Sequence, residues 1–230
     1  MRLLNAYYGV RKLRNAQILG IITTAVSILM LLMQLDESRG LSVLLVLLAL
    51  AVLGLSIAIL VLELSGVSQA SRDERSFHKA MKVLITGLVI GFVNGFIERF
   101  LGEDTPLDLI LDLASNIVSL FALYYIIQSI ARLAVRLKTL EMAERGNRLF
   151  RLLLLLHCCA LAISIASRFF PRSGSGSFLV PILICTNSLL SIVCTVLYLR
   201  YLLQTERLLL SRQIEQGPEP SGPVFGAAAE

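Results

Sequence analysis

Six long apolar segments alternate with polar connections along this chain of 230 residues. A helix needs about 20 mostly apolar residues to cross the hydrocarbon core of a bilayer, and each segment comes close to that length. The pattern predicts an all-α, polytopic membrane protein with six transmembrane helices. The predicted spans are approximately Ile18–Leu35, Leu41–Leu62, Val83–Leu101, Leu109–Ile130, Leu152–Phe170 and Phe178–Leu199.

Composition supports a membrane location and leaves little room for anything else. The chain is 56% hydrophobic and has a mean hydropathy of +0.78, whereas a soluble domain of this size carries fewer contiguous apolar residues. The connections between spans are too short to hold a soluble catalytic domain. We therefore expect one transmembrane domain over residues 1–215. Residues 216–230 are rich in Pro, Gly and Ala, which predicts a disordered cytoplasmic tail.

Positive charge is sorted to one side of the six spans. All but four of the 21 Lys and Arg residues lie there, the exceptions being Arg39, Arg99, Arg168 and Arg172. The positive-inside rule then places both termini in the cytoplasm of a multi-pass protein of the cell membrane. A basic inner surface facing anionic lipid explains the net charge of +5 without a nucleic-acid partner.

The connections on the other side are short, which predicts three helical hairpins in the same orientation. Gly20, Gly91 and Ala160 occupy similar places in the first, third and fifth spans. Two interpretations of this similarity stay open. One is an internal repeat of the kind found in transporters, and the other is a shared need for small residues where helices pack.

The third span has two contrasting faces. Gly87, Gly91 and Gly95 are four residues apart and lie on one face of a helix. Glycines at this spacing let helix backbones approach closely in lipid, so we expect this face to pack against other helices. The opposite face should contact lipid. It carries Phe92, Phe96 and Phe100.

Polar residues of the third and fourth spans form a candidate ion or ligand site. Folding the hairpin at Thr105 places Asn94 beside Asn116 and Glu98 beside Asp112. Ionisable groups at membrane depth are costly and often mark an ion or substrate path. The alternative is structural: the asparagines bond each other, Glu98 reaches the headgroups and Asp112 favours the positive end of its helix.

No metal, cofactor or catalytic site is expected. The four cysteines lie inside the fifth and sixth spans and are interpreted as packing residues. His157, Cys158 and Cys159 are adjacent, and neighbouring helical residues point 100° apart, so they cannot converge on one metal. We expect His157 to bond a neighbouring helix. Hydrolase and nucleotide-binding motifs are missing, which favours a protein that is not an enzyme.

The inner flank of the fourth span permits two structures. Residues 126–144 have helix-forming composition and continue the span as one projecting helix, or they form an ordinary basic flank.

Two functions remain. The first is a non-enzymatic interaction, assembly or accessory subunit that binds a membrane-protein partner or a second copy of itself. The alternative is a small transporter, channel or ligand-binding subunit that uses Asn94, Glu98, Asp112 and Asn116.

Overall fold

Six helices make up the part of the chain that the structure describes. The computed structural model covers residues 3–34, 42–101, 106–169 and 179–215, without the side chains of some residues near the helix ends. The predicted tail, residues 216–230, lies outside the described residues. The all-α prediction is confirmed. The helices are α1 (Leu4–Gln34), α2 (Ser42–Ala70), α3 (Phe77–Leu101), α4 (Pro106–Arg136), α5 (Leu140–Phe169) and α6 (Leu179–Glu215).

All six helices are long and apolar enough to cross a membrane. Several extend well beyond the apolar segments, and the extensions lie at one end of the bundle. Helix α1 begins at Leu4, α5 begins at Leu140 and α6 continues to Glu215. These extensions contain many polar and basic residues, so hydropathy alone does not reveal them. They pack against one another, and this tertiary packing stabilises helices whose sequence is only partly apolar.

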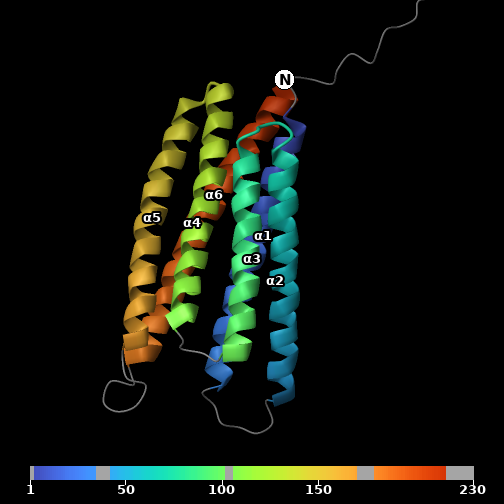
Figure 1. Cartoon of the computed structure of the whole chain (residues 1–230). Helices are drawn as coiled ribbons and strands as arrows, with labels where there is room; N and C mark the ends of the chain where they lie inside the picture. Colours follow the sequence, from blue (N-terminus) through green and yellow to red (C-terminus); the bar gives the residue numbers. More distant parts are fainter. Residues whose placement is uncertain (1–2, 35–41, 102–105, 170–178, 216–230) are drawn as a thin grey trace, which may run out of the picture.

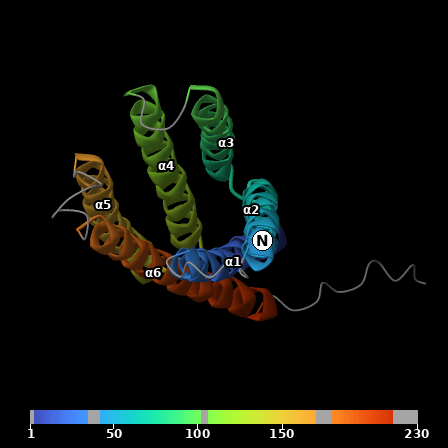
Figure 2. The same cartoon turned by 90° about the horizontal axis from the view of Figure 1, so that it is seen from below.

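Consecutive helices run alternately up and down, and the start of α1 and the end of α6 lie at the same end (Figure 1). Helix α1 packs against α2, α3 against α4 and α5 against α6, as three hairpins require. Contacts between α1 and α6 connect the first hairpin to the last. Viewed along the bundle, α3 and α4 spread away from α1 and α6, whereas α5 lies beside α6 (Figure 2).

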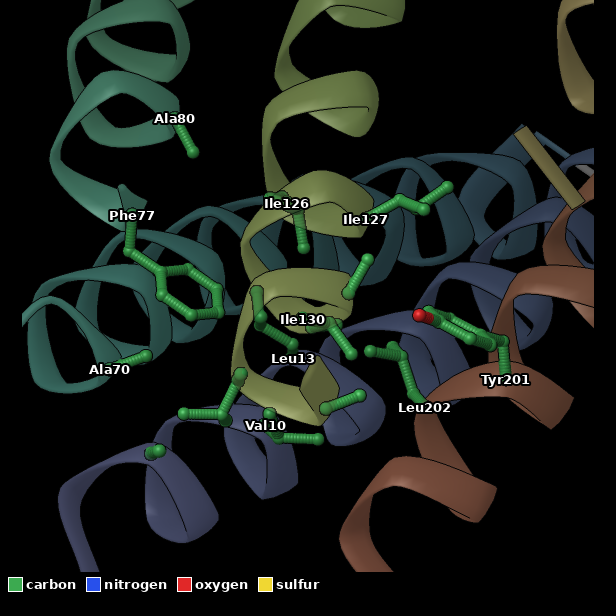
Figure 3. Packing of buried hydrophobic residues seen from close by; sticks show 14 of the residues in the cluster. Val10, Leu13, Ala70, Phe77, Ala80, Ile126, Ile127, Ile130, Tyr201 and Leu202 are labelled. Atoms are coloured by element: carbon green, nitrogen blue, oxygen red, sulfur yellow. The ribbon is translucent and has the colours of Figure 1, made fainter. Parts of the chain in front are cut away.

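Packing is concentrated at the end that carries the start of α1. We call this part the packed end, and the remainder of the helices the open end. Every buried residue among those described belongs to the packed end. Figure 3 shows side chains such as Leu13, Phe77, Ile130 and Leu202 converging there from four helices. The packed end comprises residues 3–16, 66–80, 122–153 and 194–209.

The closest helix approach in the packed end joins α1 and α2. A Cβ on Gly66 would lie 2.9 Å from the carbonyl oxygen of Gly9 and 3.2 Å from Leu13 Cγ. A Cβ on Gly9 would lie 2.8 Å from the Cβ of Ala70. Only residues without a side chain allow two backbones this close. The crossing therefore depends on both glycines.

Four polar contacts of the packed end connect segments that are distant in the sequence. Asp73 accepts hydrogen bonds from Asn5 Nδ2 at 2.9 Å and from the backbone N–H of Ala6 at 2.7 Å. Its carboxylate thus caps the free N–H groups that begin α1. The other two contacts are ion pairs. One joins α1 to α6, and the other joins α4 to the connection between α2 and α3. They are Arg14–Glu206 at 2.6 Å and Arg136–Glu74 at 2.8 Å.

Of the two structures that the sequence permits for residues 126–144, one continuous helix is wrong. Helix α4 ends at Arg136, and Lys138 adopts a positive φ of 60°. The N–H of Thr139 donates to the carbonyl of Ala134 at 2.9 Å, which satisfies a carbonyl of the last turn. A residue in the left-handed conformation just past a helix is a common terminator. Helix α5 then starts at Leu140 and returns alongside α4.

The open end presents apolar side chains outward. The phenylalanine face of α3 points outward, since Phe92, Phe96 and Phe100 are 57–75% exposed. Its predicted contact with lipid stays a prediction. Many leucines and valines of α2 are exposed as well, including Val43 at 69%. In water such a surface would be costly, whereas lipid tails solvate it.

Candidate functional site

A cavity of about 520 Å³ lies where the packed end meets the open end, and all six helices contribute to it. Ala122, Ile126, Cys194 and Tyr198 belong to the packed end and form part of its lining. Other lining residues belong to the open end. The polar members are Gln17, Glu63, Asn116, Ser119, His157, Asn187, Ser191, Thr195 and Tyr198. A volume of this size is typical of sites that bind small molecules.

Glu63 of α2 contributes a carboxylate to the cavity. The side-chain amide of Gln17 on α1 donates to Glu63 Oε1 at 3.1 Å. Glu63 lies within a candidate span that runs from Val43 to Ala70. A carboxylate at this position is expensive unless it is protonated or neutralised by a cation. Among the described lining groups it is therefore the most costly to keep ionised without a neutralising partner.

His157 of α5 faces the same cavity. Its Nδ1 lies 3.2 Å from the carbonyl oxygen of Leu153 in its own helix. A carbonyl can only accept, so Nδ1 carries the hydrogen of this bond. In the neutral ring Nε2 is then an acceptor. The prediction placed the hydrogen-bond partner of His157 on a neighbouring helix. In the structure the partner is instead the carbonyl of Leu153, one turn earlier in α5.

Helix α6 lines the cavity with a polar stripe. Asn187, Ser191, Thr195 and Tyr198 are spaced at four, four and three residues, so they share one helix face. The hydroxyl of Thr195 donates to the carbonyl of Ser191 at 2.9 Å. The Tyr198 hydroxyl is buried and has no hydrogen-bond partner among the described residues. A buried hydroxyl without a partner is unusual and costs free energy.

The predicted site of Asn94, Glu98, Asp112 and Asn116 is described only in part. Asn116 lines the cavity, whereas Asn94 does not belong to its lining. The side chains of Glu98 and Asp112 lie outside the described residues. The predicted pairing of these two carboxylates therefore stays a prediction.

The glycine face of α3 is only partly covered within the chain. A Cβ on Gly87 would lie 3.2 Å from Val118 of α4, which is consistent with close packing. Among the described residues, nothing lies within 4 Å of a Cβ on Gly91 or Gly95. Close packing at these two positions stays a prediction.

Sequence analysis missed Glu63 and Gln17. Glu63 directly follows the predicted second span, which ends at Leu62. A signal was present, because Gly66 and Val67 follow it and α2 continues to Ala70. The polar stripe of α6 could also have been found from its helical spacing.

The described lining residues offer amides, hydroxyls, thiols, one imidazole and one carboxylate. Among the residues that the structure describes, no three His, Cys, Asp or Glu side chains group in a way that could hold a metal ion. No family model, curated protein or solved structure matches the chain.

Proposed function

We propose that the chain is a multi-pass membrane protein that binds a small polar solute in its central cavity, as a small transporter or a solute-binding subunit. The observation that carries this proposal is the convergence of polar side chains from several helices on one cavity. Polar groups inside a span are costly and persist where they face water, a ligand or each other. The proposed role is binding, not catalysis.

The proposed orientation places both termini in the cytoplasm. The packed end carries most of the basic residues, and the positive-inside rule assigns that side to the cytoplasm. Cysteine labelling in intact cells tests this orientation. A cysteine at Arg72, in the connection after α2, should react only after the membrane is permeabilised, and a cysteine at Ser175 should react from outside. The reverse pattern would contradict it.

Two neighbouring native cysteines test whether the cavity contains water. Both are exposed, but Cys158 lines the cavity and Cys159 does not. Variants that retain one of them, with the other cysteines changed to alanine, are placed in lipid nanodiscs and treated with a positively charged methanethiosulfonate. We expect Cys158 to react and Cys159 to be protected by lipid. Equal protection of both residues would refute a water-filled cavity.

A second candidate function is an assembly or accessory subunit that binds another membrane protein or a second copy of itself. Gly91 and Gly95 support it, since both are exposed on the outside of α3. Small residues exposed on a span suit the approach of another helix. Cross-linking from a cysteine at Gly91 in the native membrane tests this alternative, and a lack of any cross-linked species would argue against it.

A further inference from the structure

The charge of the cavity specifies the kind of solute it accepts. Among its described lining residues Glu63 is the one acid, and no Lys or Arg contributes. With His157 neutral, an ionised Glu63 gives the lining a net charge of −1. An anionic solute would be repelled, and a monovalent cation would be attracted.

Glu63 is incompletely satisfied in the absence of a ligand. Its Oε1 accepts one hydrogen bond from Gln17, and among the described residues its Oε2 has no hydrogen-bond or ion-pair partner. Arg14, three residues before Gln17 in α1, is engaged by Glu206 at 2.6 Å. A charged carboxylate in this position lacks a counter-ion. A proton or a bound cation supplies the missing positive charge.

Tyr198 provides independent support for a ligand. Its side chain is only 5% exposed, it lines the cavity, and its hydroxyl has no hydrogen-bond partner among the described residues. A phenolic oxygen accepts a hydrogen bond from an ammonium group, and the ring attracts a cation to its face. Both properties match the charge requirement of Glu63.

We propose that the cavity binds a monovalent organic cation at Glu63 and Tyr198, and that the cation replaces the proton that neutralises Glu63 in the empty site. This inference rests on the proposed function. The exchange is balanced: the protonated carboxyl and the free cation become a carboxylate–cation pair and a released proton. Apolar side chains such as Leu84, Leu120 and Leu161 line the cavity beside the polar groups, which suits an organic ion.

Other titratable groups also face the cavity and must be separated from Glu63. They are His157 and Cys158 of α5 and Cys194 of α6, besides Tyr198. The described lining residues of α1, α3 and α4 carry no titratable group. Protonation of His157 would also weaken cation binding, so a pH effect alone does not identify the group. Comparing substitutions of Glu63 and of His157 identifies which group is responsible.

The test uses the purified full chain in nanodiscs with tetraphenylphosphonium, a permanent cation that cannot itself release a proton. We expect binding to release one proton into a weakly buffered solution. Its affinity should rise about tenfold per pH unit while Glu63 is protonated in the empty site. Glu63→Gln, which keeps a partner for Gln17, should abolish proton release. It should weaken binding roughly tenfold to a hundredfold, because the neutral amide no longer attracts the cation.

Three variants serve as controls. His157→Gln should retain proton release. Tyr198→Leu, which removes the ring face that attracts a cation, should weaken binding and retain proton release. Glu141→Gln makes the same chemical change on an exposed side chain outside the cavity and should behave as the unaltered protein. Circular dichroism and gel filtration verify that each variant is folded.

The outcomes are distinct. Proton release that depends on Glu63 supports the inference. Binding that is unchanged in Glu63→Gln, or the absence of binding in the unaltered protein, overturns it. If Cys158 is nevertheless accessible to the charged thiol reagent, only the cation inference fails and the proposed solute cavity stands. If Cys158 is protected like Cys159, the proposed function fails as well.

Discussion

The packed end and the open end of the bundle are built from the same six helices but stabilised differently. At the packed end, side chains such as Val10, Phe77 and Leu202 are fully buried. Ion pairs and a helix cap add polar contacts between distant segments. At the open end, no described residue is fully buried, and large apolar side chains point outward.

This difference follows from the solvent that each end meets. In lipid, burying an apolar side chain against another helix gains little, since lipid tails are equally apolar. Closer packing of the helices at the open end would therefore gain little free energy. At the packed end, which carries most of the basic residues, burial and ion pairing stabilise the fold. The cavity lies between these two regions.

The largest expected effect comes from two phenylalanines of one helix. Phe77 is 0% exposed and Phe92 is 75% exposed, both on α3. We expect Phe77→Ala to lower the free energy of unfolding by about 3–5 kcal/mol, because it removes a buried ring and leaves a cavity. Phe92→Ala should change it by less than about 0.5 kcal/mol. Denaturant titration in mild detergent, followed by circular dichroism, measures both. Equal losses of stability in the two variants would contradict the difference in packing between the two ends.

Two glycines of α2 provide the second comparison. Gly66→Leu should destabilise the protein by about 1–3 kcal/mol or more, since its side chain would overlap the backbone of α1. Gly54→Leu has open space around it and should be tolerated. Thermal unfolding in the same detergent distinguishes them. A tolerated Gly66→Leu would show that the close crossing of α1 and α2 is dispensable.

Two arginine–glutamate pairs sharpen the comparison further. Arg136→Met strands the buried carboxylate of Glu74, and we expect a loss of about 1–3 kcal/mol. Arg148 pairs with Glu144 on the exposed surface of α5. Arg148→Met should therefore cost less than about 1 kcal/mol. Chemical denaturation of the two variants provides the measurement, and a similar loss for both would contradict a special role for Glu74.

The smallest effect is expected at the cap of α1. Asp73→Ala removes the acceptor for Asn5 and Ala6 and should cost about 1 kcal/mol. Asp73→Asn keeps an acceptor oxygen and should cost less. Hydrogen exchange of the amide of Ala6 measures the local effect. Unchanged protection in Asp73→Ala would show that the cap contributes nothing.

Hydropathy predicted the number and approximate position of the helices, because a span needs a long apolar run. It did not predict their inner extensions. The extra turns of α1 and α6 carry polar residues that are helical through tertiary contacts such as Arg14–Glu206. The break at Lys138 was also missed, since a lysine in the left-handed conformation has no sequence signature comparable to glycine.

The site was harder to predict than the fold. Pairing residues at equal depth along the hairpin of the third and fourth spans identified Asn116, which does line the cavity. Glu63 and Gln17 come from a different hairpin, and their contact depends on how α1 and α2 cross at Gly9 and Gly66. The residue pattern of one helix does not show where that helix crosses another. Residues at the margins of apolar runs should therefore be included when membrane cavities are sought.

The contacts of α1 also have a consequence for the order in which the protein is synthesised. The first turn of α1 is capped by Asp73, and Arg14 is paired by Glu206, a residue 192 positions further along. At about 5–20 residues per second, that glutamate follows Arg14 out of the ribosome roughly 10–40 s later. The docking of α1 is thus completed only after α6 has been made. Until then Arg14 must be accommodated by lipid headgroups, water or the insertion machinery, whereas Asp73, which follows Ala6 by 67 positions, is available to the first N–H groups much earlier.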